Sequence, residues 1–90
     1  MPNTYSALSD VVNKAILRAS SYNSGEEFTI PQLFDNKLSS GVTEWEQIQI
    51  DFHNKGFVIS RMFAVNKSSP IMPLQSPRKK IKGCVVFTRK

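Results

Sequence analysis

Near the start of the chain, apolar residues recur at intervals of three and four, and this spacing constrains the local structure more than any other feature of the sequence. The stripe comprises Leu8, Val11, Val12, Ala15, Ile16 and Ala19. On a helix these positions share one face, with Lys14 and Arg18 off it. The following run 20–25 is rich in Ser and Asn and ends in Gly, which favours turns. The sequence therefore predicts a first amphipathic helix that ends in this run.

The length of the chain limits it to one hydrophobic core. Ninety residues suffice for a single modest core but not for two, so residues 1–90 are expected to form one domain. No apolar run approaches the roughly 18 residues of a membrane span, and the first residues lack the features of a signal peptide. The lone Cys84 cannot form an internal disulfide. We therefore expect a cytoplasmic protein.

Two short elements are expected before the middle of the chain. Residues 28–30 are aromatic and β-branched, which favours a brief strand. Pro31 suits the first turn of a short second helix because proline needs no amide partner there. Residues 36–41 have turn chemistry and should connect this helix to the next.

A capping box marks the start of a further helix. The Thr43 hydroxyl can accept from the Glu46 amide, while the Glu46 carboxylate can reach back to the Thr43 amide. Trp45, Ile48 and Phe52 follow at spacings of three and four. They are expected to supply the buried stripe of this helix.

Residues 57–65 fit either a helix or a strand, and we favour the helix. Gly56, just before them, could end the preceding helix or only kink it. The buried face of the favoured helix would comprise Ile59, Met62 and Phe63. Arg61 and Lys67 would then lie nearer the solvent.

The C-terminal third predicts a β-hairpin. Its first strand, 71–74, is weakened by Pro70 and Pro73 and should lie at a sheet edge. Residues 75–80 form a polar, basic tip, and 81–88 supply the second strand.

Charge is distributed very unevenly along the chain. Residues 1–51 carry seven acids and three bases, a net charge of −4. Residues 52–90 carry nine bases and no acid, a net charge of +9. Such asymmetry is typical of proteins that bind a polyanion, so the second half is where a binding site is expected.

The order of these elements resembles the winged helix-turn-helix family over nearly the whole chain. Segment 27–34 resembles the strand and helix before the turn, and 43–48 resembles the next helix start. The chain is also similar to small bacterial and phage proteins with the pattern EFT-x-x-x-LF … W-x-x-I before a basic C-terminal strand. The resemblance implies an α+β fold with three helices and a C-terminal β-hairpin wing.

The family resemblance also implies a function, which is duplex DNA binding by a regulator of transcription or an accessory factor. In this family the recognition helix enters the major groove and the wing contacts the backbone or minor groove. The recognition segment would lie within 43–67, and residues 76–80 resemble the Ser-Pro-basic-basic motif of tails that bind the minor groove. The expected DNA contacts are Lys55, Arg61, Lys67, Arg78, Lys79, Lys80 and Lys82.

Other interpretations remain open at this point. The same basic face could dock an acidic protein surface, as in a small inhibitor or adaptor, and the basic tip could be only a solvated loop. Membrane binding ranks last because no basic amphipathic helix with exposed aromatics is evident.

Catalysis and metal binding are not expected. His53 and Cys84 each stand alone, and no catalytic triad or phosphate-binding glycine motif occurs, so we expect no enzyme activity, metal or cofactor. Aromatic residues could stack on single-stranded nucleic acid, but core packing is the favoured interpretation in so small a domain. The residues concerned are Trp45, Phe52, Phe57 and Phe63.

Overall fold

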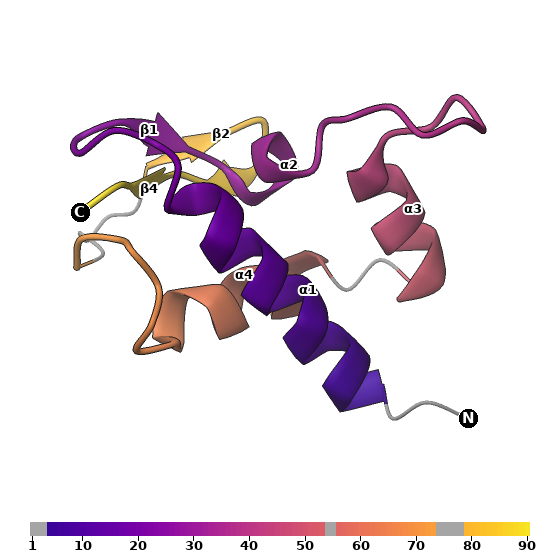
Figure 1. Ribbon diagram of the computed structural model, residues 1–90, viewed down its shortest axis with the longest axis horizontal. Helices are drawn as coiled ribbons and strands as arrows, with labels where there is room; N and C mark the ends of the chain where they lie inside the picture. Colours follow the sequence, from indigo (N-terminus) through magenta and orange to yellow (C-terminus); the bar gives the residue numbers. More distant parts are fainter. Residues whose placement is uncertain (1–3, 54–55, 74–78) are drawn as a thin grey trace.

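The computed structural model describes residues 4–53, 56–73 and 79–90, which form four helices and two small antiparallel sheets (Figure 1). The predicted α+β class is confirmed, but the described residues contain four helices where three were expected. The elements are α1 (Thr4–Ala19), β1 (Glu27–Phe28), α2 (Ile30–Leu33), α3 (Glu44–Asp51), α4 (Gly56–Val65), β2 (Lys80–Ile81), β3 (Cys84–Val85) and β4 (Phe87–Thr88). None of these helices is long and apolar enough to cross a bilayer.

The core lies where α1 and α4 cross (Figure 1). From α1, the predicted stripe contributes four buried side chains, namely Leu8, Val12, Ala15 and Ala19. The helix predicted at 57–65 is confirmed, and Ile59 and Phe63 of its predicted buried face are fully buried, whereas Met62 is only half-buried. The Phe63 ring meets the Phe87 ring edge-on at 5.0 Å between centroids, which joins α4 to β4.

A short segment connects β1 to α2 as the sequence predicts. The Gln32 side-chain oxygen accepts from the Thr29 amide at 2.9 Å, and Pro31 occupies the first turn of α2. Leu33 and Phe34 are buried beside α1. This arrangement fixes the start of the loop that leads to α3.

Helix α3 begins at the predicted cap but is less buried than expected. The Thr43 hydroxyl accepts from the Glu46 amide at 3.1 Å, whereas the Glu46 carboxylate accepts from the Thr43 hydroxyl at 3.2 Å instead of from its amide. The side chains of the predicted buried stripe are only half-buried, so the prediction that they are buried is wrong. They are Trp45, Ile48 and Phe52. The reason is that α3 packs on the margin of the core.

Gly56 is required by packing at the start of α4. A Cβ atom there would lie 2.8 Å from Cζ2 of Trp45, so the two helices meet closely at this point. We expect Gly56→Ala to lower the free energy of unfolding by about 1–2 kcal/mol, because overpacking costs about 1–3 kcal/mol and exceeds the helix-propensity gain of up to about 1 kcal/mol. Urea unfolding tests this. Combining Gly56→Ala with Trp45→Phe should recover part of the loss, and simple additivity of the two losses would contradict the proposed contact.

The C-terminal hairpin differs from the predicted one in its turn and its pairing. β2 pairs with β3, Lys80 opposite Val85 and Ile81 opposite Cys84. The turn is Lys82-Gly83, with φ of 52° and 78°, and positive φ at both positions is what a two-residue type I′ hairpin requires. The hairpin therefore turns at Lys82-Gly83, not within 75–80; residues 74–78 lie outside the described residues.

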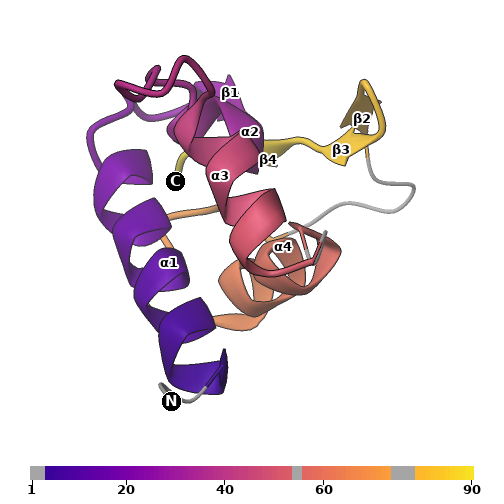
Figure 2. The ribbon, with the colours of Figure 1, turned by 90° about the vertical axis from the view of Figure 1, so that its right-hand side faces the viewer.

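The last strand lies between two segments that are distant in sequence. β4 pairs with β1 in antiparallel register, with Thr88 opposite Glu27 and Phe87 opposite Phe28. On its other side Ile71 bridges Arg89, so the predicted edge strand at 71–74 is reduced to a single bridge among the described residues. Figure 2 shows the β2–β3 hairpin extending from β4 away from α1.

Candidate functional site

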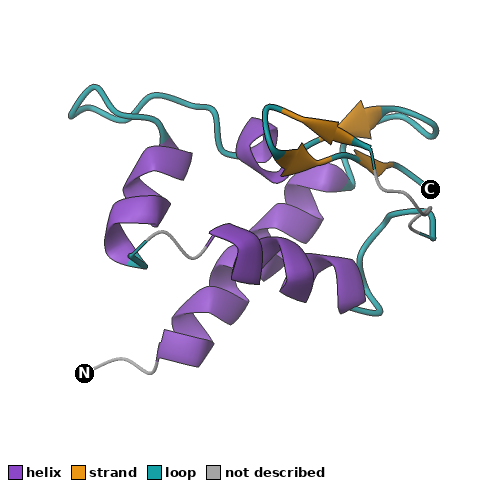
Figure 3. Ribbon diagram, turned by 180° about the vertical axis from the view of Figure 1, so that it is seen from behind, coloured by secondary structure: helices purple, strands orange, loops and turns teal. Residues whose placement is uncertain are grey.

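A groove separates α4 from the β2–β3 hairpin. Its volume is about 720 Å³, and it is lined on one side by α4 and on the other by residues of the hairpin. Figure 3, in which the molecule is seen from behind, shows the hairpin above α4. Gln49 of α3 also reaches this groove. Three elements from separate parts of the chain therefore form one hollow on the surface.

One face of α4 packs into the core and another lines the groove. Ile59 and Phe63 turn toward the core, and the groove side is formed by residues at helical spacings of three, four and seven. These residues are Phe57, Ser60, Arg61 and Ala64. The opposite wall contains Lys80 and Cys84 of the hairpin.

The charge of the groove is entirely positive among its described lining residues. Arg61 and Lys80 lie on facing walls, and no Asp or Glu is among the described residues that line it. Walls of one charge sign concentrate the electrostatic potential inside a groove and attract ligands of the opposite sign. The groove therefore suits an anionic ligand.

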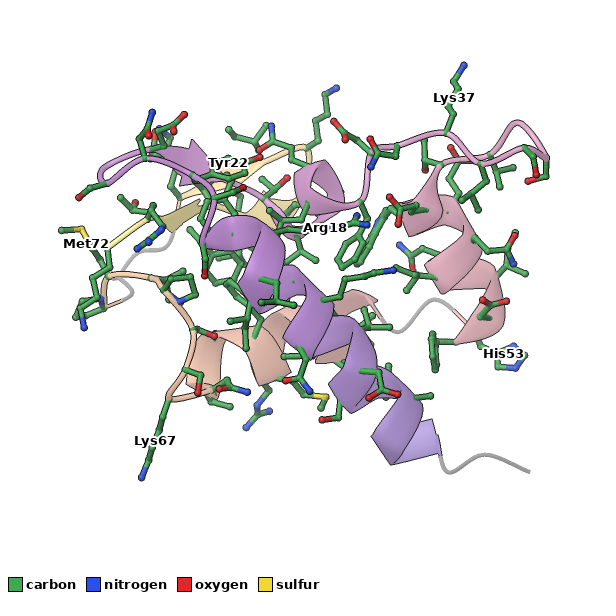
Figure 4. The ribbon with its side chains drawn as sticks, in the orientation of Figure 1. Arg18, Tyr22, Lys37, His53, Lys67 and Met72 are labelled. Carbon is green, nitrogen blue, oxygen red and sulfur yellow. The ribbon has the colours of Figure 1, made fainter. Side chains whose placement is uncertain are left out.

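Comparisons of the chain with protein-family models, with curated proteins and with solved structures gave no match. No group of three or more potential metal ligands lies together within the part of the chain that the structure describes. His53 is exposed at the end of α3, away from Arg18 and Lys67 (Figure 4).

The basic residues predicted as DNA contacts do not all lie together. Arg61 and Lys80 share the groove, and Lys82 is exposed at the hairpin turn. Lys79 forms an ion pair with Glu27 of β1, with 3.0 Å between the ammonium nitrogen and a carboxylate oxygen. Figure 4 shows Lys67 on the opposite side of the molecule from Lys37, and Lys67 is not among the residues that line the groove.

The remaining two predicted contacts, Lys55 and Arg78, lie outside the described residues. Of the predicted contacts among the described residues, the structure therefore brings only two together. Arg61 and Lys80 lie together in the groove, and Lys82 lies at the turn of the hairpin that carries Lys80.

One aromatic side chain contradicts the expectation of core packing. Phe57 is 76% exposed, while Phe63 on the same helix is completely buried. Trp45 and Phe52 are half-buried against the core. Placing Phe57 in the core was therefore wrong, and its ring instead lines the groove.

A partly buried ion pair between Arg18 and Glu44 holds α3 against α1. The sequence did not predict this contact. Both terminal nitrogens of Arg18 donate to the Glu44 carboxylate, at 2.8 and 2.9 Å. One of them also donates to the Leu33 carbonyl oxygen at 2.7 Å. The hydrogen bonds from Arg18 to its carboxylate hold the pKa of Glu44 below its usual value. Figure 4 shows Arg18 at the end of α1 that faces α2 and α3.

Proposed function

We propose that this protein is a non-enzymatic DNA-binding protein of winged-helix type, acting by occupancy as a regulator or accessory factor. The observation that carries the proposal is the pair of cations, Arg61 and Lys80, on facing walls of a groove with no acid among its described lining residues. Each cation placed on a phosphate releases condensed counterions from the duplex, which supplies affinity without a requirement for base sequence.

The arrangement of the elements supports the winged-helix assignment. In that family the recognition helix enters the major groove and a hairpin wing contacts the backbone or minor groove. Here α4 stands in the place of the recognition helix and β2–β3 in the place of the wing, while β4 returns to pair with β1. A DNA backbone running between helix and wing would pass through the groove.

The test is a titration of duplex DNA against variants of the groove cations at several salt concentrations. We expect Arg61→Gln and Lys80→Gln together to weaken binding at low salt by about tenfold or more and to reduce the salt slope by about one for each cation removed. The matched control is Lys37→Gln, which neutralises an exposed lysine outside the groove and should leave the slope nearly unchanged. Equal slopes for the wild type and the double variant would contradict the proposal.

A second candidate function is docking of an acidic protein, and exposed apolar side chains favour it. Phe57, Val65 and Ile81 are 76%, 73% and 44% exposed. Apolar groups next to cations are common at protein interfaces. A partner protein that is retained from nuclease-treated extract by the wild type and lost by Phe57→Ala would favour this function over DNA binding.

A further inference from the structure

The exposed ring of Phe57 calls for an explanation that phosphate binding alone does not give. Burial of a large apolar side chain normally stabilises a fold, yet this ring stays in contact with solvent at the first turn of α4. One helical turn further along, Arg61 lies on the same face, and Ser60 lies between them. An aromatic ring and a cation therefore occupy adjacent positions on one wall.

The other sides of the groove add two more kinds of polar group. Lys80 faces this wall from the hairpin, and the Gln49 side chain enters from α3. The groove thus combines a flat ring, two cations, an amide and a hydroxyl. These groups match the parts of a nucleotide, since a base can stack on the ring, its edge can bond to amide or hydroxyl, and its phosphates can pair with the cations.

We propose that the groove holds an unpaired nucleotide, with the base stacked on Phe57 and the flanking phosphates near Arg61 and Lys80. This inference rests on the proposed function and names its preferred substrate, a duplex that contains an unpaired base. In an intact duplex both faces of each internal base are covered by its neighbours, so Phe57 would have no face to stack on. An unpaired base can leave the stack and enter the groove.

The size and charge of the groove favour a nucleotide over an apolar partner surface. Its volume of about 720 Å³ lies within the range of about 300–1,000 Å³ of clefts that hold a small ligand. Among its described lining residues the only charged ones are Arg61 and Lys80. An apolar partner surface would leave both cations without a counter-charge, which is unfavourable in a closed interface.

The experiment compares three versions of one duplex: fully paired, with a single unpaired adenosine, and with an abasic nucleotide at that same position. The abasic version keeps the phosphates and the distortion but removes the base. We expect the wild type to bind the unpaired adenosine about tenfold more tightly than the abasic version, the size of effect typical of one base stacked on an aromatic side chain.

Substitutions at Phe57 then identify the stacking group. Phe57→Leu should abolish the preference while keeping the salt-dependent affinity for the paired duplex, and Phe57→Trp should retain the preference. The matched control is Leu17→Ala, which removes a side chain of similar exposure, 74%, on α1 and outside the groove. It should leave both the preference and the affinity unchanged. Circular dichroism should confirm that all variants remain folded.

Three results would overturn the inference. Equal binding of the unpaired and abasic versions by the wild type would reject the nucleotide site and leave the proposed function intact. Retention of the preference in Phe57→Leu would reject the role of the ring. A change in self-association of Phe57→Leu in sedimentation, with unaltered binding ratios, would assign the ring to contact with a second copy. Failure of the proposed function itself is distinguishable, because the wild type would then bind none of the three duplexes in a salt-dependent manner.

Discussion

Replacement of Phe63 by alanine is expected to lower the free energy of unfolding by about 3–5 kcal/mol, the usual range for loss of a buried phenylalanine. The Phe63 ring is completely buried and lies between two other rings. Its centroid is 5.0 Å from that of Phe87 and 6.1 Å from that of Phe28. Alanine would leave a cavity where α4, β1 and β4 meet. Since small domains are stabilised by only about 5–15 kcal/mol, much of the total stability would be lost.

Equilibrium urea unfolding followed by tryptophan fluorescence and circular dichroism measures this loss. The matched control is Phe57→Ala, the same substitution six positions earlier on the same helix. Because Phe57 is 76% exposed, its removal should change stability by no more than about 0.5 kcal/mol. Comparable losses for the two variants would contradict the assignment of one ring to the core and the other to the groove.

The same pair of variants separates stability from binding. Phe63 anchors α4 to β4, which follows directly from the hairpin, so it positions both walls of the groove without lining it. Phe57 lines the groove without stabilising the core. Phe63→Ala should therefore reduce nucleic-acid binding only in proportion to the fraction unfolded, and Phe57→Ala should reduce binding of the duplex with an unpaired base in a folded protein.

The helices were predictable from the sequence because their signals are local. The apolar stripe and the turn-forming run predicted that α1 ends within 20–25, and the structure ends it at Ala19, directly before that run. The residue spacing within 57–65 favoured a helix although its composition suited a strand, and the helix is confirmed. The Thr43 cap likewise marked the start of α3.

The predicted hairpin turn was wrong, because the actual turn begins with a residue that is unusual at that position. Type I′ turns usually place Asn or Asp before Gly, whereas here Lys82 adopts the left-handed conformation. The pairing of β1 with β4 joins residues about sixty positions apart, and no local pattern specifies such a contact. The basic composition of 75–80 instead suggested a tip there.

The candidate site was predicted in part. Arg61 and Lys80 belonged to the expected contacts because of charge and position, and the structure places both in one groove. Phe57 was assigned to the core by composition, although its position two residues before Ile59 puts it on the opposite side of the helix. The helical spacing was the better guide, and it would have identified the exposed ring.

The contact between Arg18 and Glu44 was not predictable, because the two residues are 26 positions apart and each has an ordinary surface role in its own helix. In the sequence, Glu44 is only an acid at the start of its helix. In the structure its charge is matched by Arg18, whose guanidinium also lies 5.1 Å from the centre of the Phe34 ring. The pair therefore couples α1, α2 and α3.

Arg18→Met is expected to lower the free energy of unfolding by about 2–3 kcal/mol, because it leaves the Glu44 carboxylate and the Leu33 carbonyl without their donors. A double-mutant cycle with Glu44→Gln measures the coupling directly. The matched control is the Lys79–Glu27 pair, whose side chains are 61% and 48% exposed, compared with 29% and 16% for Arg18 and Glu44. Exposed pairs couple by about 0.2–1 kcal/mol, so equal coupling in the two cycles would contradict the structural role of Arg18.

The pH dependence of stability gives a second, independent measure of this contact. The folded protein lowers the pKa of Glu44 below its ordinary value of 4.5, chiefly through the hydrogen bond from Arg18. A carboxylate with a lowered pKa stabilises the fold above the unfolded-state value, and this stabilisation is lost as the pH falls through the folded-state value. The difference in the free energy of unfolding between the wild type and Glu44→Gln should therefore be largest near neutral pH. It should shrink as the pH falls below 4.5. A gap that stays constant down to acid pH would show that the ionised carboxylate does not hold α3 against α1.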